Sequence, residues 1–79
     1  MVLLHSMKTM TELYDVQQLL KKFGIYIHLG KRIYDIELMK MELKNIYDAG
    51  LLDKDEYLVA DLILRREHRL ESELQDDLG

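Results

Sequence analysis

Hydrophobic side chains recur at helical spacing along most of the chain. Between residues 13 and 23, and again between residues 33 and 46, they stand three or four positions apart, which places them on one face of a helix. The first set is Leu13, Val16, Leu20 and Phe23, and the second is Ile33, Ile36, Met39, Leu43 and Ile46. Each set predicts an amphipathic helix with one buried face.

A third and longer helix is predicted to follow Asp53. Asp is a favoured N-cap residue, Glu56 falls three positions later, and no Gly or Pro interrupts the chain before Leu78. The first half of this segment is densely apolar, whereas the second half keeps only Leu70, Leu74 and Leu78 among charged residues. Because helix length grows by 1.5 Å per residue, the third helix is expected to extend beyond its two neighbours.

Glycines separate these helical segments. Gly is the usual residue just past a helix C-terminus, and Gly24, Gly30 and Gly50 divide a chain that contains no proline. At the other end of the first helix, Thr9 followed by Glu12 has the spacing of a capping box, so we expect the helix to open there.

Residues 25–29, Ile-Tyr-Ile-His-Leu, alternate in the manner of a β-strand. Since the chain offers no second strand and an isolated strand is unstable, we expect an extended linker with Ile25, Ile27 and Leu29 directed inward. Pairing with the same segment of a second chain is the alternative.

The predicted fold class is therefore all-α: a small three-helix bundle with a short extended linker between helices one and two. Residues 10–79 are expected to form a single domain, and residues 1–9 an N-terminal extension. A chain of 79 residues buries a thin core, and it has no cysteine for disulfides or thiolate metal sites. We therefore expect helix packing and self-association to stabilise it, in the cytoplasm. No apolar run approaches the roughly 20 residues of a membrane-spanning helix.

Charge is distributed unevenly. Residues 1–45 contain seven Lys/Arg and five Asp/Glu, a balance of +2, whereas residues 46–79 contain four and ten, a balance of −6. The acidic half argues against wrapping of the whole chain by nucleic acid, but it leaves open a local basic face.

No arrangement of residues indicates catalysis, a metal site or a cofactor. His68 shares a helical face with Glu67 and Glu71, but a metal site needs three or four convergent ligands. An exposed charged face with ordinary i,i+4 pairs, Asp61–Arg65 and Arg69–Glu73, is the favoured interpretation. The isolated glycines also form no phosphate-binding loop, so we expect a protein that is not an enzyme.

A local basic and aromatic cluster suggests one possible activity. Positive charge beside an exposed aromatic ring is what single-stranded RNA or DNA requires, for phosphate neutralisation and base stacking. The candidate nucleic-acid-binding residues are Lys21, Lys22, Tyr26, Lys31 and Arg32.

The leading hypothesis is a helical interaction module, with a regulatory role, that binds another protein or itself. The second helix has a wider apolar surface than one neighbour requires, and the third has a sparse leucine stripe near its end. The candidate protein-interface residues are Leu38, Met41, Tyr47, Leu70 and Leu74.

Several sequence strings resemble the YqgQ-like family of small proteins from Gram-positive bacteria. They are Tyr14–Leu20 with Lys22-Phe23-Gly24, Gly30-Lys31-Arg32 leading into Asp35–Met39, and Leu62–Glu67. Their order and spacing match over residues 12–67. The resemblance implies a compact helical bundle of unestablished function without a catalytic motif, and it brings no active-site residues.

Overall fold

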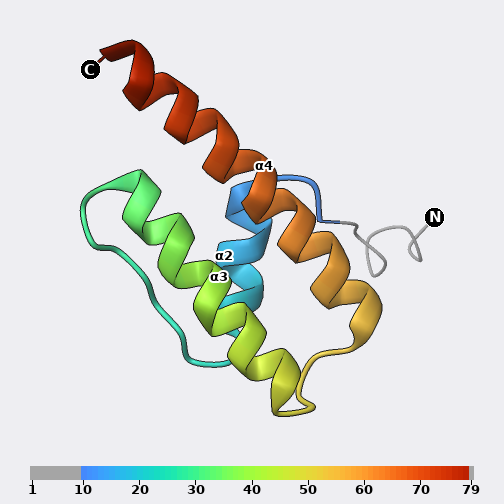
Figure 1. The fold of residues 1–79 in the computed structure, drawn as a ribbon. Helices are drawn as coiled ribbons and strands as arrows, with labels where there is room; N and C mark the ends of the chain where they lie inside the picture. Colours follow the sequence, from blue (N-terminus) through green and yellow to red (C-terminus); the bar gives the residue numbers. More distant parts are fainter. Residues whose placement is uncertain (1–9, 79) are drawn as a thin grey trace, which may run out of the picture.

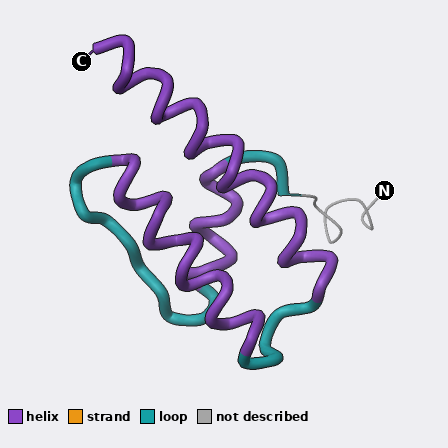
Figure 2. Tube along the Cα trace, in the orientation of Figure 1, coloured by secondary structure: helices purple, strands orange, loops and turns teal. Residues whose placement is uncertain are grey.

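The computed structural model describes residues 10–78, which fold into three helices joined by two loops, with no strand in that part of the chain (Figures 1 and 2). The helices are α2 (Leu13–Lys21), α3 (Arg32–Asp48) and α4 (Lys54–Leu78). The predicted all-α three-helix bundle is confirmed. The predicted N-terminal extension and Thr9 lie outside the described residues.

The core consists of the apolar stripes that the sequence pattern identifies. In α3, all five predicted residues are buried, and Ile36, Met39 and Leu43 are completely so. The buried face of α2 packs against α3 and α4, and α4 adds Ala60, Ile63 and Leu64 from its first half. Because the three stripes meet along one axis, a single thin core holds the bundle together.

The first helix begins later than predicted. The N-cap is Glu12 rather than Thr9, and Asp15 takes the N3 position. The Asp15 Oδ2 atom accepts hydrogen bonds from the backbone N–H groups of Thr11 (2.9 Å) and Glu12 (3.0 Å). A nearby carboxylate thus satisfies backbone donors that precede the first helical turn.

The glycines lie just past the ends of α2 and α3, although α2 ends three residues before Gly24. Gly24 and Gly50 both have φ of 78°, the left-handed conformation that glycine adopts without a Cβ penalty. At the start of α4, the Asp53 Oδ1 atom accepts a hydrogen bond from the Asp55 N–H group at 2.8 Å, which confirms Asp53 as the capping residue.

The linker between α2 and α3 runs along the outside of the bundle (Figure 1). Ile25 and Ile27 are partly buried against the core, as predicted. The prediction for Leu29 is wrong, since its side chain is 60% exposed. Its backbone N–H group instead donates to Asp35 Oδ1 at 2.6 Å, at the point where the chain turns into α3 through Gly30.

The third helix extends past the other two (Figure 1). Near the end of the bundle, the start of α2 reaches α4 through Thr11 and Arg66, and the start of α3 reaches it through Arg32 and Glu71. Residues 72–78 continue as helix beyond that level.

Candidate interaction surfaces

The predicted basic and aromatic cluster is spread along the linker rather than gathered at one point. Lys21 and Lys22 close α2 at one end of the linker, and Lys31 and Arg32 open α3 at the other (Figure 1). Tyr26 lies between them with its side chain exposed to solvent. The structure therefore does not bring the two basic pairs together around one aromatic ring.

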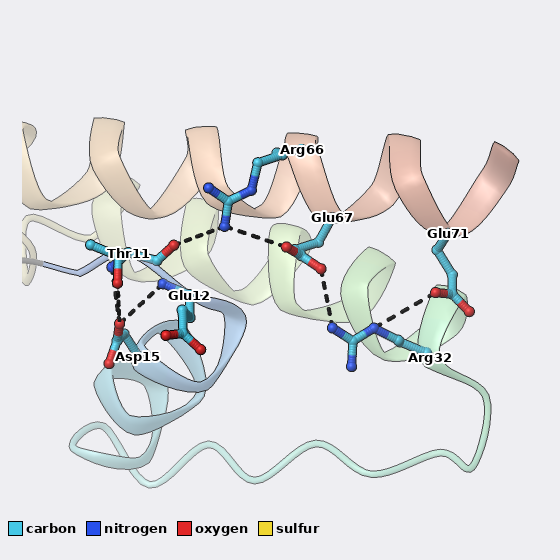
Figure 3. Close-up of polar contacts among 7 residues, drawn as sticks. All are labelled: Thr11, Glu12, Asp15, Arg32, Arg66, Glu67 and Glu71. Atoms are coloured by element: carbon cyan, nitrogen blue, oxygen red, sulfur yellow. Dashed lines mark hydrogen bonds and ion pairs between the residues drawn. The ribbon is translucent and has the colours of Figure 1, made fainter. Parts of the chain in front are cut away.

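Arg32 is already engaged by acidic side chains of α4. Its guanidinium lies 3.1 Å from Glu67 Oε1 and 3.7 Å from Glu71 Oε2 (Figure 3). Since two carboxylates neutralise this charge, Arg32 has little left to offer a phosphate. Lys31 also has a local contact, because its Nζ atom lies 5.8 Å from the centre of the Tyr34 ring.

A chain of polar contacts ties the starts of α2 and α3 to the middle of α4 (Figure 3). The Arg66 Nη2 atom donates to the Thr11 carbonyl oxygen at 2.8 Å and lies 3.3 Å from Glu67 Oε2. Glu67 in turn binds Arg32. These contacts join α4 to both neighbouring helices, and they already engage the guanidinium groups of Arg32 and Arg66.

The three predicted protein-interface residues of α3 differ in how far they are available to a partner. Tyr47 is used within the fold, because its ring stacks on Tyr57 of α4 with centroids 4.2 Å apart and planes inclined by 9°. Leu38 is half-buried, and Met41 is exposed. Only Met41 presents most of its side chain to solvent.

Leu70 and Leu74 form a more open surface on α4. They continue the stripe that begins with Ala60 and Ile63, at successive spacings of three and four through Glu67. Ala60 and Ile63 are buried by α2 and α3, whereas Leu70 and Leu74 are 47% and 52% exposed. The apolar side of α4 that faces the core therefore continues past the point where the core ends.

A second exposed leucine pair was not anticipated from the sequence. Leu58 and Leu62 are 50% and 68% exposed, although both lie in the apolar first half of α4. When most residues of a helical segment are apolar, the sequence does not show which of them face outward. In the structure Ala60, Ile63 and Leu64 face the core, so Leu58 and Leu62 lie on the opposite side of the helix.

The described residues contain no group of three or more His, Asp or Glu side chains that could hold a metal ion. His68 Nε2 lies 3.0 Å from Glu37 Oε2 of α3, so it makes an ordinary contact between helices. Asp61 and Arg65 form the predicted i,i+4 pair at 2.8 Å, but no ion pair joins Arg69 and Glu73 within residues 10–78.

Among the residues that the structure describes, the pKa of Lys44 is clearly shifted. The hydrogen bond to Asp48, together with the charge of that carboxylate, raises the pKa of Lys44 above its ordinary value. Both side chains are exposed at the end of α3, so this pair marks a surface contact rather than a reactive site. Within residues 10–78, no helix combines the length and apolar character needed to cross a bilayer.

Comparison with known proteins gives a consistent result. Residues 7–70 match the YqgQ-like family. The chain is also 43% identical over 58 residues to an uncharacterised protein, YqgQ, of Bacillus subtilis (strain 168), and the match covers 73% of this chain and 82% of that protein. With most of its length matched, including all of α2 and α3 and the first part of α4, the chain belongs to the YqgQ-like family.

Proposed function

We propose that this protein is a non-enzymatic helical interaction module that pairs with a second copy of itself through the end of α4. The observation that carries the proposal is the exposure of Leu70 and Leu74 on the same stripe that α4 buries against its own bundle. An apolar stripe that continues past the last neighbouring helix is a surface suited to another helix.

The charges beside this stripe favour an antiparallel second copy as the occupant. Going along α4, Arg66 lies four positions before Leu70 and Glu73 lies three positions after it, so a basic and then an acidic residue flank the exposed leucines. Two copies running in opposite directions would place the basic part of each beside the acidic part of the other.

The helix dipole supports the same arrangement. The last turn of α4 contains no basic residue, so acidic side chains stand at the negative end of the helix. Arg66 flanks the exposed leucines, and in an antiparallel pair the partner's Arg66 would lie nearer these acidic side chains than in a parallel pair and would offset part of this unfavourable charge.

The association is expected to be weak. Two leucines from each copy, each already about half buried, gain roughly 3–6 kcal/mol on full burial, and the freedom lost on association offsets part of this gain. The Kd is therefore expected to be no tighter than about tens of micromolar. A weak dimer suits a module whose pairing responds to concentration.

Sedimentation velocity between 20 µM and 1 mM (about the expected range of Kd) tests the proposal. The wild-type protein is expected to shift from monomer to dimer, and Leu70→Gln/Leu74→Gln to remain monomeric, because Gln keeps helix propensity while removing the apolar face. The matched control is Leu58→Gln/Leu62→Gln, which changes an equally exposed leucine pair on α4. Equal loss of dimer in both variants, or a wild-type monomer throughout, would contradict the proposal.

Binding of single-stranded nucleic acid is the alternative proposal, through Lys21, Lys22, Tyr26, Lys31 and Arg32. It has less support, because Arg32 is neutralised by two glutamates and the basic pairs stand at opposite ends of the linker. Salt-dependent binding of labelled single-stranded RNA that is lost in Lys21→Glu/Lys22→Glu would favour it.

A further inference from the structure

The linker carries a short edge of unpaired backbone. One end is fixed by the Ile25 N–H group, which donates to the Leu20 carbonyl oxygen at 3.1 Å, and the other by the bond from the Leu29 N–H group to Asp35. Between these points, the N–H and C=O groups of residues 26–28 make no hydrogen bond within the described part of the chain. Hydrogen bonds therefore hold the segment at both ends, and the backbone groups between those ends are unpaired within the described residues.

The side chains of this segment alternate as they do in a strand at the edge of a sheet. Ile25 and Ile27 pack against the core, whereas Tyr26 and His28 are exposed. In extended backbone, alternate residues direct their N–H and C=O groups to the same edge, so Tyr26 and His28 share one edge. Two such residues can exchange four hydrogen bonds with an antiparallel strand.

A groove of about 400 Å³ lies beside this segment. It is lined by Gln17, Leu20 and Lys21 of α2, by residues 25–28, and by the buried Met39. An extended chain placed in the groove would therefore meet both residues 25–28 and Lys21.

The charge around the groove indicates what kind of chain it would accept. Residues 16–34 contain four Lys/Arg and no Asp or Glu; of these four, Lys21 lines the groove and Arg32 is engaged by Glu67 and Glu71. Lys21 and Lys22 have no ion pair within residues 10–78, so their charge is available to a ligand.

We propose that residues 25–29 form a docking edge that takes up an extended acidic peptide as an added strand. The main chain of the peptide would pair with Tyr26 and His28, and its carboxylates would bind Lys21 and its neighbours. This surface is separate from Leu70 and Leu74, so the inference does not depend on the α4 dimer.

Two other occupants fit the observations less well. A phosphate backbone accepts hydrogen bonds but donates none, so it would leave the C=O groups of residues 26–28 facing negative charge. A second copy of the linker, paired antiparallel about Ile27, would place Lys22 of one chain opposite Arg32 of the other and next to its Lys31.

Fluorescence anisotropy with a designed nine-residue peptide tests the inference. The labelled probe alternates Glu with Thr and Val, and the comparison peptide has Lys in place of each Glu. The acidic probe is expected to bind at least tenfold more tightly than the basic one (about one order of magnitude), and to weaken as salt rises. Absence of a difference between the two peptides would overturn the inference.

Backbone pairing is tested separately from charge. His28→Pro removes one N–H group that has no partner in the fold, whereas His28→Ala keeps it; the Pro variant is expected to bind the acidic probe about tenfold less tightly than the Ala variant. A second check leaves the protein unchanged and places N-methyl groups on alternate residues of the probe. Methylation of the residues whose N–H groups face the linker should weaken binding, whereas methylation of the residues between them should not. Equal binding of all these forms, or RNA binding that His28→Pro leaves unchanged, would overturn the proposed edge.

Discussion

Asp15 illustrates how one side chain determines where a helix begins. Its carboxylate accepts hydrogen bonds from two backbone N–H groups that precede α2, and it stands at the third position of the helix, where negative charge is favoured. The sequence pattern offered Thr9 and Glu12 as the capping pair, and Glu12 and Asp15 three residues later have the same spacing. Spacing alone does not choose between two candidate capping pairs that share Glu12.

Replacing Asp15 with Ala is expected to lower the free energy of unfolding by about 0.5–2 kcal/mol, because two N–H groups lose their acceptor. Urea denaturation followed by circular dichroism measures the change. Asp76→Ala is the control, since Asp76 is an exposed acidic residue of α4, and it should change stability by less than about 0.5 kcal/mol. Equal effects of the two substitutions would mean that Asp15 acts only through its charge.

Arg32 shows what the sequence could not predict at the residue scale. Its partners Glu67 and Glu71 lie 35 and 39 positions away along the chain, so no local spacing rule connects them. Charges that lie near Tyr26 in the sequence predict a basic cluster, whereas the packing of α3 on α4 decides which of those charges are paired. Within residues 10–78, Lys21 and Lys22 have no ion-pair partner, whereas Arg32 has two.

At the scale of elements, most of the fold could be predicted. Helical periodicity identified every buried residue of α3, and the glycines indicated where the loops begin. The differences are at the ends: α2 spans Leu13–Lys21 and so closes three residues before Gly24, and Leu29 faces outward. Alternation in the linker predicted an inward Leu29, but Gly30 turns the backbone there and Asp35 holds it.

The end of α3 offers a prediction at this scale. Gly50 has φ of 78° and a Cβ placed on it would meet no atom within 4 Å, so Gly50→Ala is strained by its backbone conformation and not by contacts. We expect the free energy of unfolding to fall by about 1 kcal/mol, measured by urea denaturation. Gly50→Asn should lose less, because Asn tolerates the left-handed region. Wild-type stability in Gly50→Ala would refute the explanation.

At the scale of the whole molecule, the defining feature is the mismatch in helix length. The helix α4 has 25 residues, whereas α3 has 17 and α2 has 9. The two shorter helices therefore leave the C-terminal end of α4 uncovered. The sequence indicated this overhang and its leucines. It did not indicate the outward position of Leu58 and Leu62, which depends on how the three helices are rotated against one another.

The most direct test of the proposed antiparallel pair is a distance measurement between two copies. The chain contains no cysteine, so a single Cys at Gln75 or at Lys54 accepts one spin label per copy. If two α4 helices cross near residue 72, the Gln75 labels should lie within about 30 Å of each other. Each Lys54 lies 18 residues from that midpoint, which at 1.5 Å per residue separates the Lys54 labels by about 54 Å. Double electron–electron resonance that gives a short distance at Gln75 and a long one at Lys54 is the predicted result. A short distance at Lys54, or no coupling at either position at millimolar protein, would contradict the account.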